Sequence, residues 1–187
     1  KFKIDIGQAV VGGKKTNFIE AFSIGLVSDL FPAADDINHG KFGAVAEFIK
    51  TLAVAPPSDF KIWLDDAEEP LTGPGFIFLA VNMPVVGANF RLGKRSAMQD
   101  GKLGMLFFQD STKFDLLTYM LQGFKDGPPK ADKIKHKLAQ KIKVQAKPKM
   151  SLMFDGVPFG EGDAEISILK HGLTVMVPKS SRVKQTA

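Results

Sequence analysis

Two short turns hold the carboxylates best placed to do chemistry, Gln99-Asp100-Gly101-Lys102-Leu103-Gly104 and Phe154-Asp155-Gly156-Val157-Pro158. A carboxylate in such a turn can hold a divalent cation or act as a general base. Asp-Gly is also a common turn pair, because both residues tolerate a positive φ angle. Each motif alone is therefore better explained as a hairpin turn, and its spacing leaves the function open.

Other site chemistries find little support in the sequence. The chain has no cysteine, which excludes disulfides, thiolate zinc sites and thiol nucleophiles and agrees with a cytoplasmic protein without requiring one. The three histidines, His39, His136 and His171, have no paired zinc-ligand spacing. The run Gly12-Gly13-Lys14-Lys15-Thr16 superficially resembles a phosphate-binding loop. It lacks the required spacing and lies between two strand patterns, so a hairpin turn is predicted.

Positive charge is concentrated in one segment. The net charge of the chain is +5, and residues 125–149 contain nine lysines against only Asp126 and Asp132. Such a segment could attract nucleic-acid phosphates or an anionic membrane surface. Nucleic acid is disfavoured because residues 130–149 contain no Phe, Tyr or Trp for base stacking. We expect membrane contact through Lys130, Lys133, Lys137 and Lys141; the alternative is that Lys133, Lys137 and Lys141, spaced four apart, form a solvated helical face.

The apolar patterns predict a mainly β domain that positions these residues. A chain of 187 residues with 44% hydrophobic residues can bury a sizeable core. The continuous apolar run 75–81 is typical of a buried central strand. Further strands are predicted at 1–11, 18–24, 60–64, 103–108, 142–146, 151–155, 164–169 and 173–177, with helices at 41–53 and 113–124.

The expected fold class is therefore an antiparallel β-sandwich or flattened barrel with two or so helices. One domain is expected over residues 1–179, followed by a polar tail at 180–187. No apolar run approaches the roughly 18 residues that a membrane-spanning helix needs. The chain starts at Lys1 within an alternating pattern, so we expect it to be a piece of a longer protein.

The order of several motifs resembles the C-terminal domain of the bacterial diacylglycerol kinase-like lipid kinases. The motifs are Lys3-Ile4-Asp5-Ile6-Gly7, the stretch 17–26, the Gly-led helix 40–48, the stretches 81–87 and 97–103, and the final pair 154–158 and 173–178. Together they cover residues 1–178 in the family's order. Each motif is a short turn by itself, and their order carries the resemblance.

This resemblance implies that the parent protein is a cytoplasmic, membrane-peripheral kinase. It would use ATP and magnesium to phosphorylate the hydroxyl of a diacylglycerol-like lipid, and this lobe would hold the acyl chain in a shallow apolar pocket. The implied partners are the lipid substrate, an anionic membrane surface and an N-terminal nucleotide-binding lobe. That lobe, which holds ATP and the general base in the family, has no counterpart in this chain, so we expect the chain alone to be inactive.

The sequence departs from the family at the two carboxylate turns. Asp155 and Gly156 match the family turn, but Val157 replaces the acidic residue that faces the nucleotide cleft. Asp100 keeps one of three carboxylates at a loop that holds magnesium in the family, while Gln99 and Gly104 replace the other two. Losing two of three carboxylates should weaken a magnesium site strongly. These departures keep a second hypothesis open, a divergent non-catalytic lipid-binding or scaffolding relative.

Overall fold

A computed structural model describes residues 1–27, 50, 54–83, 85–86, 90–91, 98–109, 112–113, 115–116 and 134–176. Every strand pairing in this part of the chain is antiparallel, which confirms the predicted mainly β class. Most of the two predicted helices and the polar tail lie outside the described residues. Lys113, Asp115 and Leu116 are helical, as expected near the start of the second predicted helix. Within the described ranges no helix is long and apolar enough to cross a membrane.

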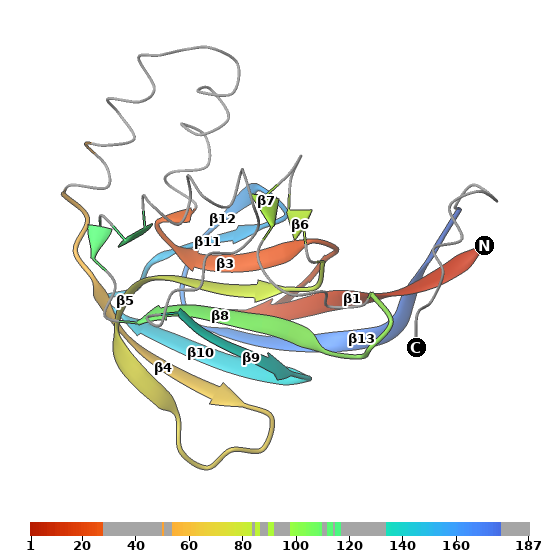
Figure 1. The fold of residues 1–187 in the computed structure, drawn as a ribbon, viewed down its shortest axis with the longest axis horizontal. Coiled ribbons are helices and arrows are strands. Elements are labelled where there is room, and N and C mark those ends of the chain that lie inside the picture. The colour runs from red at the N-terminus through yellow and green to blue at the C-terminus, as the bar shows by residue number, and fades with distance from the viewer. Residues whose placement is uncertain are drawn as a thin grey trace.

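Eleven strands form one curled sheet, and two short strands form a separate ribbon (Figure 1). The sheet order is β12-β11-β3-β5-β4-β10-β13-β1-β2, with β8 pairing to β5 and β9 pairing to β8. The bounds are β1 (Phe2–Val11), β2 (Lys14–Phe18), β3 (Ala21–Gly25), β4 (Ser58–Leu64), β5 (Leu71–Val81), β6 (Val85–Val86), β7 (Phe90–Arg91), β8 (Leu103–Gln109), β9 (Ile134–Ala139), β10 (Lys141–Lys147), β11 (Ser151–Phe154), β12 (Val157–Glu161) and β13 (Ala164–Val175).

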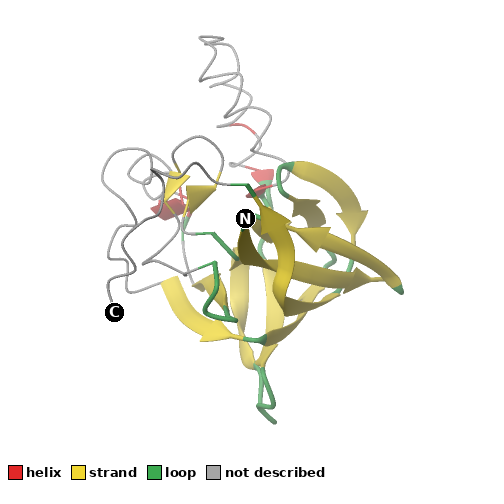
Figure 2. Ribbon diagram, turned by 90° about the vertical axis from the view of Figure 1, so that its right-hand side faces the viewer, coloured by secondary structure: helices red, strands yellow, loops and turns green. Residues whose placement is uncertain are grey.

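Strand β5 is the branch point of the sheet. Its first half, from Leu71 to Gly75, pairs with β4, and its second half, from Ile77 to Val81, pairs with β3. The second half also pairs with β8, with a register shift between Gly75 and Phe78. Strand twist and this register shift bend the sheet, which curls into an open half-barrel (Figure 2).

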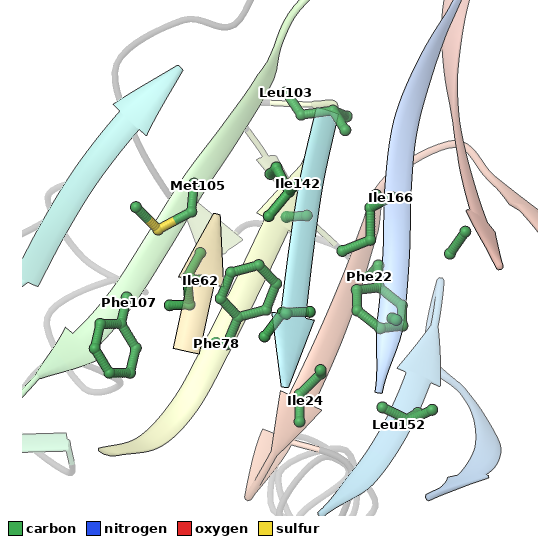
Figure 3. Close-up of a cluster of buried hydrophobic side chains, with 14 of the residues drawn as sticks. Phe22, Ile24, Ile62, Phe78, Leu103, Met105, Phe107, Ile142, Leu152 and Ile166 are labelled. Atoms are coloured by element: carbon green, nitrogen blue, oxygen red, sulfur yellow. The ribbon is translucent and has the colours of Figure 1, made fainter. Parts of the chain in front are cut away.

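The main core fills the inside of this half-barrel. Alternate residues of the strands point inward, among them Phe78 and Ala80 of β5 and the side chains labelled in Figure 3. The intervening β5 residues Ile77, Leu79 and Val81 belong to a second apolar cluster on the other face, together with Leu106 and Leu116. Because β5 is covered on both faces, the run 75–81 is buried throughout, as its continuous apolar pattern predicted.

The first hairpin forms as predicted, but its continuation does not. Gly12 and Gly13 both have positive φ angles, +55° and +81°, and join β1 to β2. The predicted strand 18–24 is wrong, because the chain bends at Ile19 and Glu20. Residues before the bend pair with β1 in β2, and residues after it pair with β5 and β11 in β3. The local alternation of apolar residues could not show this corner, because the side chain that holds it, Asp155, is far away in the sequence.

Near the C-terminus the two predicted strands 164–169 and 173–177 are one strand, β13. His171 has a φ angle of +54°, and the pairing with β1 shifts register between Ile4 and Ile6. This bulge interrupts the alternation that the sequence pattern follows, although the strand continues through it. Strand β12 was not predicted; all five of its residues are exposed, so it lacks the alternating burial that marks a strand.

The lysine-rich segment is extended and not helical where the structure describes it. Residues 134–139 form β9 and residues 141–147 form β10, so the proposed helical face with lysines four apart is wrong. In β10 three lysines and Gln145 alternate with buried Ile142, Val144 and Ala146, which is a strand period of two. Lys137 and Lys141 are exposed, while Lys130 and Lys133 lie outside the described residues.

Candidate functional site

A buried carboxylate, Asp5, organises the region around the first candidate turn. Its side chain is 1% exposed, and it lies where β1 and β13 shift register. Oδ1 accepts the backbone N–H of His171 at 2.7 Å, and Oδ2 accepts the backbone N–H of Gly101 at 2.8 Å. A buried carboxylate is costly unless it is hydrogen-bonded, and two backbone donors here meet that need. Asp5 therefore ties the turn to both strands.

The turn from Met98 to Lys102 is held at several further points. The backbone N–H of Asp5 donates to the Met98 carbonyl at 2.7 Å, and the Gln99 side-chain amide donates to the Lys3 carbonyl. Asp100 is exposed, and its Oδ1 accepts the backbone N–H of Lys102 at 2.9 Å. Asp100 thus closes its own turn, and Gln99 stabilises the attachment of that turn to β1.

Asp155 uses its carboxylate to build the corner between β2 and β3. Oδ2 accepts the backbone N–H of Ile19 at 2.7 Å, and Oδ1 accepts those of Glu20 at 2.8 Å and Ala21 at 3.0 Å. Its own N–H donates to the Ala21 carbonyl at 2.9 Å. The φ angles of Asp155 and Gly156 are +46° and +83°, as the predicted hairpin turn requires. With three donors on it, this carboxylate has a structural task.

Val157 follows this turn as the first residue of β12, and 65% of its surface is exposed. Phe159, two residues further, is 37% exposed and packs edge-on against Phe154, with 4.8 Å between ring centroids. Neither side chain can ligate a cation or accept a proton. The position where the resemblance implied an acid therefore presents an apolar surface beside the turn.

Asn82 joins the two turns into one polar network. It is 1% exposed, and its side-chain nitrogen donates to the carbonyl of Asp5 at 3.0 Å and to that of Ile19 at 2.8 Å. Its backbone N–H donates to the Glu20 carbonyl at 2.9 Å. The network therefore runs from Asp155 through the corner and Asn82 to Asp5 and the Gly101 turn. The structure brings the sequence motifs together in this way.

Sequence reasoning singled out Asp100 and Asp155 but missed Asp5 and Asn82 as organising residues. Both missed residues stand inside motifs that carry the family resemblance, and Asp5 also interrupts an apolar strand between Ile4 and Ile6. A lone acid between two buried isoleucines was the available signal. Gly104 lies apart from the turn chemistry, buried in β8, where an added Cβ would meet Val81 Cγ2 at 2.8 Å.

A shallow groove with a volume of about 470 Å³ lies along β4, β5 and β10. It is lined by Asp59, Phe60, Lys61, Thr72, Gly73, Gln145 and Lys147.

Asp65, in the acidic connection between β4 and β5, holds the start of β10. Asp65 Oδ1 accepts the backbone N–H groups of Gln140 at 2.7 Å and Lys141 at 2.9 Å. Asp66, Glu68 and Glu69 follow in the same β4–β5 connection and are exposed. Lys143 pairs with Glu165 at 3.7 Å. One lysine of the segment 125–149, although not one of the four predicted to contact a membrane, is therefore paired within the fold.

No protein-family model matches this chain, and no curated protein matches its sequence at a significant level. Solved structures do match. A diacylglycerol kinase from Bacillus anthracis str. Sterne aligns with a TM-score of 0.61 and 14% identity, over 91% of this chain and 52% of that one. A putative diacylglycerol kinase from the same organism aligns with a TM-score of 0.65 and 20% identity, over 91% of this chain and 55% of that one. Another structure described as a putative diacylglycerol kinase from this organism aligns with a TM-score of 0.64 and 18% identity, again over 91% of this chain and 55% of that one.

These comparisons define the class of fold. The chain has the β-rich fold found in about half of each of these diacylglycerol kinase structures, and it spans about half of their length. The likeness extends over nearly the whole chain, so the motif order seen in the sequence and the three-dimensional fold point to the same relatives. Identities of 14–20% establish the fold alone.

Proposed function

We propose that this chain is the C-terminal, lipid-contacting lobe of an ATP-dependent lipid kinase. The observation that carries the proposal is the fold, which aligns over 91% of the chain with diacylglycerol kinase structures. The parent protein would transfer the γ-phosphoryl group of ATP to the hydroxyl of a diacylglycerol-like lipid. The chain spans about half of those structures, so a second lobe that holds ATP is part of the proposal.

Phosphoryl transfer depends chiefly on positioning and on charge neutralisation by metal ions and cationic groups. We assign the binding of ATP and its magnesium ion mainly to the other lobe. The role of this chain would be to form one wall of the cleft. The network from Asp155 through Asn82 to Asp5 supports such a role, because it fixes three loops relative to one another without offering a free, buried carboxylate for proton transfer.

A second candidate function is a non-catalytic lipid-binding or scaffolding relative. Two observations favour it: Val157 is exposed where the family resemblance implies an acid, and the carboxylate of Asp155 is occupied by three backbone donors. A relative that lost the phosphoryl-transfer activity would keep the fold and these structural contacts.

Membrane association is the remaining part of the proposal. Lys137 and Lys141 are exposed on β9 and at the start of β10, and they would meet anionic headgroups at the cytoplasmic surface. The acidic β4–β5 connection beside Lys141 would oppose this contact, so we assign the larger share to Lys137.

A transfer assay on the full-length parent protein separates the two functions. Labelled ATP is incubated with vesicles that contain diacylglycerol or a sphingoid lipid, and the extracted lipids are counted. Incorporation into one lipid class supports the kinase. Vesicle binding without incorporation into any lipid favours the non-catalytic relative.

A further inference from the structure

The donor set of the Met98–Lys102 turn and its neighbour Gly104 does not fit the magnesium ion that the family resemblance implies. Asp100 is the one carboxylate in residues 98–104, and its Oδ1 already accepts the Lys102 N–H. Gln99 directs its amide nitrogen to the Lys3 carbonyl, and Gly104 offers no side chain. Mg²⁺ requires near-octahedral oxygen ligation. Across the described ranges no cluster of three or more His, Cys, Asp or Glu side chains could hold a metal ion.

The other carboxylate of the region, Asp5, is also committed. Its two oxygens accept the N–H groups of Gly101 and His171, and its side chain is 1% exposed. A cation that approached Asp5 would have to replace these backbone donors. The Asp5 carboxylate thus links two chain segments, as a bound metal ion could, because it accepts a backbone N–H group from each of them.

A lysine lies directly against this turn. A Cβ atom on Gly101 would stand 2.3 Å from Cε and 3.0 Å from Nζ of Lys170, so the lysine side chain occupies that space. Gly101 also has a φ angle of +67°, which favours glycine. Lys102 and Lys3 are exposed on the same region. The Lys170 ammonium group therefore lies beside the residue that follows Asp100, and a positive charge there opposes the binding of a divalent cation at Asp100.

We propose that the Met98–Lys102 turn is held by protein groups alone, without a divalent cation, and that the ammonium group of Lys170 adds a stabilising positive charge beside it. Asp5 anchors the turn to β1 and β13, and Lys170 packs over Gly101 from β13. The inference goes beyond the proposed kinase function, because it concerns the stability of this turn and holds for either candidate function.

Thermal unfolding of this chain in EDTA and in about 10 mM Mg²⁺ tests the metal part. A site with a dissociation constant of about 0.1 mM would raise the midpoint by about 5–10 °C under these conditions. We expect no resolved difference between the two conditions. A rise of that size in the wild type that disappears in Asp100→Asn would overturn the proposal. A rise that persists in Asp100→Asn places the cation elsewhere and supports the turn as proposed.

Lysine variants test the second part. Lys170→Met removes the ammonium group but keeps an unbranched side chain over Gly101, and we expect its midpoint to fall by about 2–4 °C, less so at high salt. Lys170→Arg should retain most of the stability. Lys102→Met is the matched control, because it removes an exposed lysine that belongs to the turn itself and not to β13. Equal midpoints for Lys170→Met and Lys102→Met would refute the role of Lys170.

Discussion

Removing the Asp155 carboxylate should destabilise the protein through the corner it holds. Three backbone N–H groups, those of Ile19, Glu20 and Ala21, donate to it at 2.7–3.0 Å. A hydrogen bond to a charged group contributes about 1.5–3 kcal/mol. Two of these three bonds are exposed, so water can replace them in part. Asp155→Ala also places alanine at a φ angle of +46°, which costs about 1 kcal/mol. We expect a total loss of about 3–5 kcal/mol in the free energy of unfolding.

Asp155→Asn separates the two contributions. Asparagine tolerates the positive φ angle and keeps one carbonyl oxygen for two of the three donors, so we expect a loss of only about 1–2 kcal/mol. Asp163→Ala is the matched control, because Asp163 is an exposed aspartate in the connection between β12 and β13. Its loss should stay within about 0.5 kcal/mol.

Urea unfolding followed by the fluorescence of Trp63, the single tryptophan, measures these differences. The midpoints should shift while the slope with urea stays constant, because the surface exposed on unfolding does not change. An Asp155→Ala variant as stable as Asp163→Ala would refute the structural role of this carboxylate. The Asp155 carboxylate would then be available to bind a ligand or a cation.

Three further predictions use the same fold. Asn82→Asp should lower the free energy of unfolding by about 3 kcal/mol or more, because it removes a buried donor and sets a charge against two carbonyl groups; urea unfolding measures it. Ser23→Ala should leave stability unchanged or raise it by about 1 kcal/mol in the same assay, since the buried Ser23 hydroxyl has no hydrogen-bond partner in the described structure. Lys137→Gln should weaken sedimentation with anionic vesicles about five-fold, and Lys141→Gln less, because the Asp65 hairpin lies beside Lys141. Equal binding to neutral and anionic vesicles would contradict the membrane proposal.

The sequence predicted best those elements whose signals are local. The continuous run 75–81 is a buried strand because both of its faces are covered, and Gly12-Gly13 is a hairpin because both residues have positive φ angles. The segment 134–147 was harder, because lysines spaced by four fit a helix and lysines spaced by two fit a strand. The alternate positions Ile142, Val144 and Ala146 indicate a strand, because only one face of β10 packs against the core.

The site depended on contacts that no local pattern contains. Asp5 binds residues 96 and 166 positions away, and Asp155 binds the corner 134–136 positions away. The sequence could mark these aspartates as unusual, one within an apolar strand and one in an Asp-Gly turn. It could not show that both carboxylates accept backbone donors and that Asn82 links them.

Transfer of labelled phosphate to a lipid hydroxyl by the full-length parent protein tests the central claim most directly. The substrate is diacylglycerol in vesicles, and the control is an analogue with the same acyl chains that lacks the free hydroxyl. The account predicts labelled product from diacylglycerol and none from the analogue. A full-length protein that binds both ATP and the vesicles, yet labels neither diacylglycerol nor any other lipid with a free hydroxyl, would contradict it.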